Sequence, residues 1–120
     1  MESSSLLYVV KSIVKPEVER EWDKWHSDSH VPDVLKQPGF LKATKLHRSD
    51  SIDSDPEYWT IYEMTSLEAF QSYNNSEAAR RLRDDHKERW GSLTKLERFV
   101  LVKTFEATNP QSEPKATARK

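Results

Sequence analysis

The 120-residue chain contains no cysteine and two glycines. It also has no apolar run near the ~20 residues of a membrane span. Without cysteine there is no disulfide, no thiolate metal site and no cysteine nucleophile, which is compatible with a reducing compartment. Charge of one sign is lacking too, because 19 Lys and Arg against 20 Asp and Glu leave a formal net charge of -1. A protein without a basic field suits neither nucleic acid nor an anionic membrane. We therefore expect a cytoplasmic protein with neither of these partners.

Length and local composition predict one folded domain followed by a tail. A chain of 120 residues can bury one core but has no room for separate catalytic and cofactor domains. We expect this domain to occupy residues 1–106. The stretch 107–120 is polar and contains proline, with too little apolar area to offset the entropy of ordering, and is predicted to be a disordered tail.

Hydrophobic periodicity predicts alternating strands and helices. Strands are indicated by β-branched and aromatic residues at 6–14, 40–48, 57–64 and 95–105. A first helix is expected to begin at Pro16 and to close between Pro32 and Pro38-Gly39. A short helix is predicted from Leu67 to Asn74, and Ser76 is placed to cap a further one.

The order strand, helix, strand, strand, helix, strand is that of an α+β, ferredoxin-like βαββαβ sandwich. In this fold both helices cover the same face of a four-stranded antiparallel sheet. Yet the first, third and fourth predicted strands carry apolar or aromatic side chains on both faces, and an uncovered face of that kind is larger than monomers usually expose. The most economical cover is the sheet of a second copy, so we expect a homodimer with its sheets face to face.

The most informative motif lies in the second half of the predicted first helix and extends beyond its end. It is the segment Trp25-His26-Ser27-Asp28-Ser29-His30-Val31-Pro32, followed by Pro38-Gly39-Phe40. With this segment the chain resembles the dimeric α/β-barrel superfamily, and within it the EthD-like group. His26 stands where that pattern usually carries tyrosine, and Ser29 where an acid normally precedes the histidine. The resemblance implies a cleft between the first helix and the sheet. It also implies a range of chemistries: cofactor-independent isomerases, polyketide cyclases, quinone-forming monooxygenases and haem-binding enzymes.

His30 is the candidate catalytic residue. An imidazole that titrates near neutrality can take a proton from a carbon acid or a phenol and return it without a cofactor, so none is expected. The alternative is a structural role, in which the ring holds the turn before Pro32. The candidate substrate-contacting residues are aromatic or imidazole side chains: Trp25, His26, Tyr58, Trp59, Tyr62 and His86.

Other histidine roles are weaker hypotheses. His26 and His30 have the i, i+4 spacing of a helical metal pair, but no third ligand is fixed by local spacing, so no metal is expected. His86 lies on an apolar helical stripe, where it is either a core histidine or one that faces the cleft. His47 ends a strand and is predicted at the surface or at a dimer rim. Nothing singles out a haem ligand. The run 80–83 is interpreted as an exposed charged helix face.

Two classes of function remain open. The first is a cofactor-independent lyase, isomerase or cyclase that acts on a hydrophobic carbonyl or phenolic, polyketide-like metabolite, with a cofactor-independent monooxygenase as a variant. The second is a ligand-binding or structural dimer without chemistry, in which the aromatic residues fill the barrel.

Overall fold

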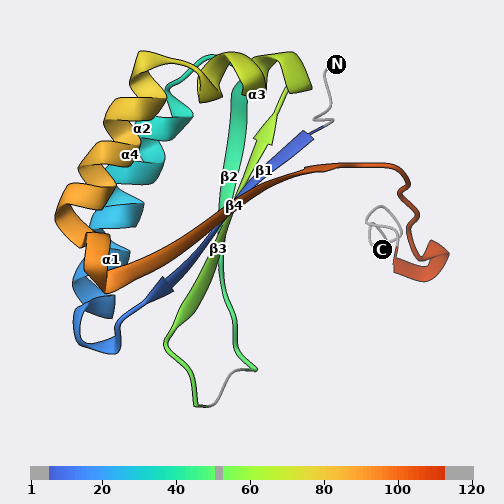
Figure 1. The fold of residues 1–120 in the computed structure, drawn as a ribbon. Helices are drawn as coiled ribbons and strands as arrows, with labels where there is room; N and C mark the ends of the chain where they lie inside the picture. The colour runs from blue at the N-terminus through green and yellow to red at the C-terminus, as the bar shows by residue number, and fades with distance from the viewer. Residues whose placement is uncertain (1–5, 51–52, 113–120) are drawn as a thin grey trace.

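The structure, a computed structural model, describes residues 6–50 and 53–112. Four antiparallel strands form one sheet in the order β2-β3-β1-β4. Their bounds are β1 Leu6–Val14, β2 Phe40–His47, β3 Glu57–Met64 and β4 Thr94–Val102. All helices longer than one turn lie on the same side of this sheet (Figure 1). The predicted α+β ferredoxin-like fold is therefore confirmed. Strand β4 ends earlier than predicted, because Val102 is paired with Leu6, where β1 begins.

The first helical region is built from four short segments. A 3-10 turn at Pro16–Val18 leads into α1, Glu19–Trp25, which is followed by a π-helical turn at His26–His30 and by α2, Val31–Leu35. Pro32 does not end the helix as expected. The Val31 N–H donates to the carbonyl of His26, five residues earlier, and Pro32 then occupies the first turn of α2, where its missing N–H costs no helical hydrogen bond.

The second helical region comprises α3, Leu67–Asn74, α4, Glu77–Trp90, and a 3-10 turn at Gly91–Leu93. Hydroxyl side chains cap both α-helices. Ser66 accepts a hydrogen bond from the Ala69 N–H at 3.0 Å, and Ser76 accepts one from the Ala79 N–H at 3.1 Å. The predicted cap at Ser76 is thus confirmed.

The core lies between the helices and the sheet, in two clusters. One cluster gathers seven buried residues at the α3 end: Leu6, Tyr8, Val34, Tyr62, Met64, Tyr73 and Ala79. The other gathers Val14, Trp22 and Tyr58 at the α1 end. The opposite face of the sheet carries Trp59 packed edge-on against Phe99, with ring centroids 5.6 Å apart, and no helix of the described residues covers that face (Figure 1).

Beyond β4 the chain runs away from the body as an extended arm (Figure 1). Phe105 on this arm is 83% exposed, and a 3-10 turn at Pro110–Ser112 follows. Residues 113–120 of the predicted tail lie outside the described residues. Across residues 6–50 and 53–112, no helix combines the length and apolarity that a membrane crossing requires.

Candidate functional site

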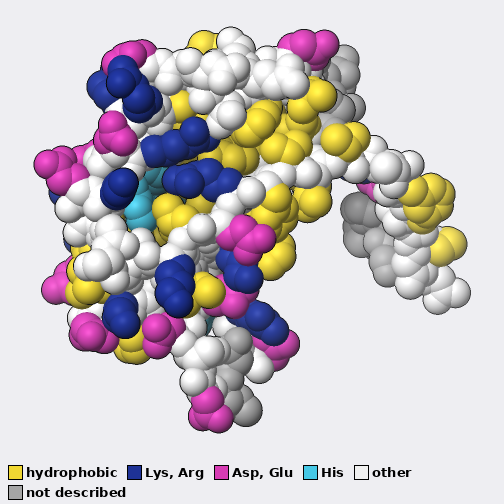
Figure 2. All heavy atoms as spheres, in the orientation of Figure 1, with side chains coloured by type: hydrophobic (Ala, Val, Ile, Leu, Met, Phe, Trp, Pro, Cys, Tyr) yellow, Lys and Arg dark blue, Asp and Glu magenta, His cyan; other side chains and the backbone are white. Residues whose placement is uncertain are grey.

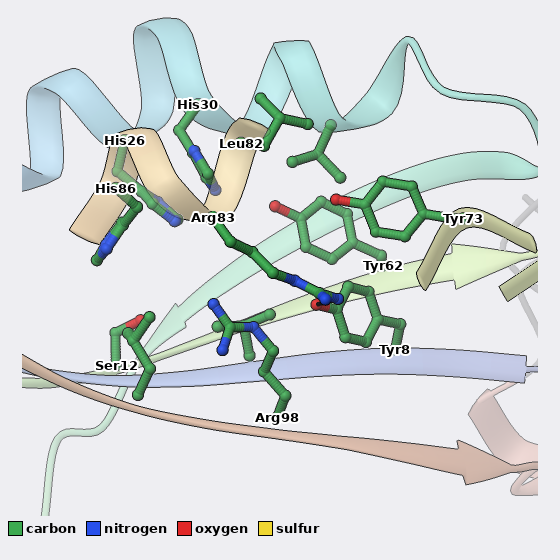
Figure 3. Close-up of a pocket in the computed structure, with 13 residues that line it drawn as sticks. Tyr8, Ser12, His26, His30, Tyr62, Tyr73, Leu82, Arg83, His86 and Arg98 are labelled. Atoms are coloured by element: carbon green, nitrogen blue, oxygen red, sulfur yellow. Dashed lines mark hydrogen bonds between the residues drawn. The ribbon is translucent and has the colours of Figure 1, made fainter. Parts of the chain in front are cut away.

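A narrow cavity opens between α2, α4 and the sheet (Figure 3). Its enclosed part measures ≈20 Å³, and the whole cleft, counted with the open solvent at its mouth, measures ≈400 Å³. Its lining combines imidazole, phenol, guanidinium and aliphatic side chains: Tyr8, Val10, Ser12, His26, His30, Val34, Tyr62, Tyr73, Leu82, Arg83, His86, Leu96 and Arg98.

Three histidines form one end of the cavity. His26 and His30 are four residues apart in the helical region and face the same side, and their rings stack with centroids 5.4 Å apart at 23°. His86 from α4 meets His30 edge-on at 5.6 Å. π turns within helices are frequently found at functional sites, since they change the direction in which the local side chains point. The turn thus builds a wall of imidazoles facing the sheet.

All three imidazoles are uncharged at pH 7. Burial, with a smaller contribution from the nearby Lys45 ammonium, lowers the pKa of His26 to about 2. Burial is also the main cause that lowers the pKa of His30 and of His86, each to about 4. A buried imidazole loses the hydration that stabilises its charged form, so the neutral base is favoured.

Hydrogen bonds fix the tautomers of two of these rings. The Lys45 ammonium lies 3.3 Å from His26 Nδ1 and has only donors, so Nδ1 accepts and the ring proton is on Nε2. The Trp22 Nε1–H donates to His86 Nε2 at 3.1 Å, which leaves the His86 proton on Nδ1. His26 and His86 therefore each use one ring nitrogen to accept a hydrogen bond from another side chain of the protein.

His30 is different. Its Nδ1 is buried and has no hydrogen-bond partner among the described residues. Trp25 packs against the ring of His30, with centroids 5.2 Å apart. His30 is thus a held, neutral imidazole on the cavity wall whose ring nitrogen is not committed to a protein group.

Three tyrosines form the opposite end. Tyr8 and Tyr62 stack with centroids 5.6 Å apart, and Tyr8 lies 6.3 Å from Tyr73. The hydroxyls of Tyr62 and Tyr73 point into the cavity (Figure 3). Burial raises the pKa of Tyr62 far above its usual value and that of Tyr73 to about 12. Both side chains are therefore neutral phenols that can donate a hydrogen bond to a ligand.

Two arginines reach in from the remaining sides. Arg83 comes from α4, and its Nη2 donates to Asn74 Oδ1 at 2.7 Å and to Tyr8 Oη at 3.3 Å. Arg98 comes from β4 and points up toward the same space (Figure 3). In the space-filling view a histidine is visible between basic side chains, next to an apolar surface (Figure 2). The cavity is thus positively charged at its mouth and neutral inside.

The structure brings four of the predicted site residues together at this cavity: His26, His30, Tyr62 and His86. Trp25 lies behind the wall and packs against the rings of His30 and His86. Tyr58 lies four residues before Tyr62, about 13 Å away along β3, and donates to Glu19 Oε2 at 2.6 Å. Trp59 faces the opposite side of the sheet and donates to Glu57 Oε2 at 2.7 Å.

Several cavity residues were not singled out from the sequence, namely Tyr8, Ser12, Tyr73, Arg83 and Arg98. Arg83 precedes His86 by three positions, so helical spacing alone would have placed both on one side. Arg80 and Arg81 are exposed as expected, but Arg83 turns inward, so the interpretation of the run 80–83 as one exposed face is wrong at that residue. Arg98 pairs with Val10 across β1 and β4, a register that the sequence does not reveal.

The histidine cluster does not have the form of a metal centre. Among residues 6–50 and 53–112, no group of three or more His, Asp or Glu side chains is arranged to hold an ion. Because the His26 and His30 rings stack, their in-plane lone pairs point along parallel planes and do not converge on one position. His47 is exposed and stacks on Tyr58 at 4.6 Å, away from the cavity.

Fold and site together define a small α+β, ferredoxin-like domain with a cavity between its helices and its sheet. The family profile described as "Domain of unknown function (DUF4286)" matches residues 5–104. The chain belongs to this family. Comparison with curated proteins gives no significant match.

Solved structures confirm the resemblance at the level of the fold. An EthD family protein from Bacillus halodurans superposes with a TM-score of 0.66 at 15% identity, covering 82% of this chain and 99% of that one. SnoaB, a cofactor-independent oxygenase from Streptomyces nogalater, gives 0.58 at 23% identity, covering 90% and 99%. MhuD, in a structure with two manganese protoporphyrin IX molecules per active site, gives 0.62 at 19% identity, covering 87% and 99%.

Proposed function

We propose that the chain is a cofactor-independent acid–base enzyme, a lyase, isomerase or cyclase, that acts on a hydrophobic carbonyl or phenolic metabolite with His30 as the base. One observation carries this proposal: His30 is a neutral imidazole on the cavity wall, held by Trp25, with a buried Nδ1 that has no partner among the described residues. A base must be unprotonated and uncommitted before it can accept a substrate proton.

The rest of the cavity suits the charge that such a step creates. His30 takes a proton from a carbon acid or a phenol and becomes an imidazolium, while the substrate becomes an enolate or phenolate. The phenol groups of Tyr62 and Tyr73, whose pKa burial raises further above neutrality, can donate hydrogen bonds to the new oxyanion. The proton then returns to another atom of the substrate or to its leaving group, so no cofactor is consumed.

A cofactor-independent oxygenase is the variant of this chemistry. SnoaB, which shares the fold, is named as such an enzyme. The first step would be the same deprotonation, after which an electron-rich substrate anion passes an electron to oxygen. Oxygen uptake that depends on His30 would distinguish this variant from isomerisation.

A second candidate is a ligand-binding protein without turnover. It is favoured by the small enclosed volume, ≈20 Å³, which holds a water or two but no metabolite without movement of side chains. It is also favoured by the low basicity of His30, whose pKa of about 4 lies below the range of most general bases.

We further propose that the protein is a cytoplasmic homodimer whose domain ends near residue 106. The uncovered face of the sheet, where Trp59 packs on Phe99 and Leu101 is 46% exposed, would be the contact between copies.

Deuterium exchange tests the catalytic proposal with simple model compounds in place of the natural substrate. The purified protein is incubated in D₂O with carbon acids of increasing apolar size, such as acetylacetone, phenylacetone and phenylpyruvate, and wash-in is followed by NMR. We expect wild type and the control His47→Gln to accelerate exchange of at least one compound, and His30→Gln to lose roughly 100-fold or more. Compounds that bind without accelerated exchange would favour the binding protein.

A further inference from the structure

We propose that the ligand of this cavity is a small aromatic carboxylate, whose carboxylate lies between Arg83 and Arg98 and whose ring lies among the tyrosines. This inference deepens the proposed function by naming a substrate class for the same site. It also predicts that such carboxylates bind to the protein, and this binding can be measured whether or not turnover occurs.

The charge of the lining is the first argument. The residues around the cavity include two guanidinium groups and no carboxylate, and the three histidines contribute no charge at pH 7 because burial lowers each pKa to about 4 or below. Arg83 is half-buried and Arg98 is exposed at the mouth, and an anion that binds between them would form charge-assisted hydrogen bonds with both. The charge of the lining therefore favours an anionic ligand over a cationic one.

Arg98 is the second argument, because its positive charge acts on most of the cavity. It forms no ion pair with any residue in the described part of the chain, although ten ion pairs occur there. Burial is the largest cause of the pKa shift of several cavity residues, and the Arg98 charge acts on all of them: His30, His86, Tyr62 and Tyr73. These residues come from four different elements, so Arg98 projects into the space that they share.

Arg83 provides the second half of the binding site. Asn74 and Tyr8 both accept from its Nη2, which holds the guanidinium in place, whereas its Nε is buried without a partner among the described residues. A guanidinium offers donors in a planar fork that matches the two oxygens of a carboxylate. Arg83 is thus positioned with donor capacity that the protein itself does not use.

The remaining lining selects an aromatic body of modest size. Tyr8, Tyr62 and Tyr73 present ring faces and edges, and Val34 and Leu82 add apolar surface. Since the enclosed space is only ≈20 Å³, side chains of the lining must move when the ligand enters. That requirement favours a single ring over a fused polycycle.

Binding of an anion would also affect His30. Burial is the main reason for its lowered pKa of about 4, but the charge of Arg98 lowers it further, while Asp85 and Asp33 at the rim act in the opposite direction. A carboxylate next to Arg98 offsets the positive charge and so raises the His30 pKa toward its usual value. The correct substrate would thereby strengthen its own base.

Isothermal titration with a matched pair of probes tests the proposal. 4-Hydroxybenzoate and 4-hydroxybenzamide have nearly the same shape and differ in charge. At 0.15 M salt we expect wild type to bind the carboxylate at least about tenfold more tightly, since hydrogen bonds between charged groups are stronger than those to a neutral amide. Arg98→Gln and Arg83→Gln should each lose this preference, and Arg98→Lys should keep part of it.

Arg81→Gln, an exposed change on the same helix as Arg83, is the control and should keep the wild-type preference. Thermal melts confirm that each variant is folded, and if Arg83→Gln does not fold, Arg98→Gln alone decides. Equal affinity for the two probes, or a preference that survives in Arg98→Gln, would overturn the inference. Exchange activity with neutral ketones but no carboxylate preference would support the proposed function and contradict this inference. Carboxylate binding that depends on Arg98, without turnover, would support this inference and contradict the proposed function.

Discussion

Trp22 connects the core of the protein to its candidate site. Its side chain is 0% exposed and stacks on His26 at 4.4 Å, while its indole N–H donates to His86 Nε2. One buried side chain thus fixes the position of one cavity histidine and the tautomer of another. The same stripe of the first helix that anchors the domain also orients the imidazoles.

Replacement of Trp22 by Phe should therefore lower the free energy of unfolding by more than the loss of ring volume alone would. We expect a loss of about 2 kcal/mol beyond that of Trp90→Phe, because Trp22→Phe leaves a buried histidine acceptor unpaired and removes packing at a fully buried site, whereas Trp90 is half-buried. Trp90 is the matched control, since its indole N–H is buried without a partner among the described residues and its removal breaks no hydrogen bond. Urea unfolding measures both variants, and equal costs would contradict the importance of the Trp22–His86 bond.

The lowered pKa values of His26, His30 and His86 predict acid sensitivity. In the unfolded chain these rings take up protons near pH 6.5, whereas in the folded state they stay neutral down to about pH 4 or below. The unfolded state therefore binds more protons in this window, and stability falls as pH drops from about 6.5 toward 4. Above pH 6.5 these groups leave the stability unchanged.

The size of this effect is roughly 1 kcal/mol for each histidine and pH unit. Urea unfolding at pH 7 and pH 5 should show the loss in wild type and in His47→Gln, whose ring is exposed. His30→Asn should show a smaller loss, because one of the three buried rings is gone. The same pH dependence in His30→Asn and wild type would show that His30 is not held neutral.

At the scale of elements, the sequence predicted most of the strands and helices but not the π turn. β1 and β3 have the predicted bounds, because dense β-branched and aromatic residues between turn signals leave few alternatives. Taken by itself, Pro32 predicts that the helix ends there, since proline has no N–H to donate. The π turn before it removes the need for that N–H, and no local pattern in the sequence indicates such a turn.

Gly39 fixes the connection between α2 and β2. Its φ is 90°, and a Cβ there would lie 2.6 Å from Ala69 Cβ at the start of α3. Gly39→Ala should destabilise the domain by roughly 2 kcal/mol or more, from backbone strain and overpacking together. Gly91→Ala is the control, because its Cβ would make only an ordinary contact at 3.7 Å and should change stability by less than about 1 kcal/mol. Similar melting temperatures for the two variants would contradict this geometry.

At the scale of the whole molecule, the candidate site was only partly predictable. His30, His26, Tyr62 and His86 follow from motif, strand alternation and helical stripe. Arg98 does not, because its place in the cavity depends on the pairing of β4 with β1, two strands at opposite ends of the chain. Tyr58 shows the converse: strand alternation places it on the same face as Tyr62, but does not reveal how far along the strand the cavity extends. Trp59 misses the cavity because it lies on the opposite face.

The proposed dimer makes a prediction that separates the two faces of the molecule. Leu101 lies on the uncovered sheet face and Leu67 at the start of α3, and they are 46% and 48% exposed. Leu101→Lys should weaken or abolish the dimer in analytical ultracentrifugation, since it places a charge in an apolar interface, whereas Leu67→Lys should not. A monomeric wild type, or a dimer equally tolerant of both changes, would show that the sheet face is not the contact.

The most direct test of the central claim is the pH dependence of kcat/KM for the exchange reaction between pH 5 and pH 8, because this ratio reports the pKa of the base in the free enzyme. With His30 as a buried base of pKa about 4, the profile should be flat across this range in wild type, and activity should be lost in His30→Gln. A rise centred near pH 6.5, as for an exposed histidine, or a profile that persists in His30→Gln, would contradict the account.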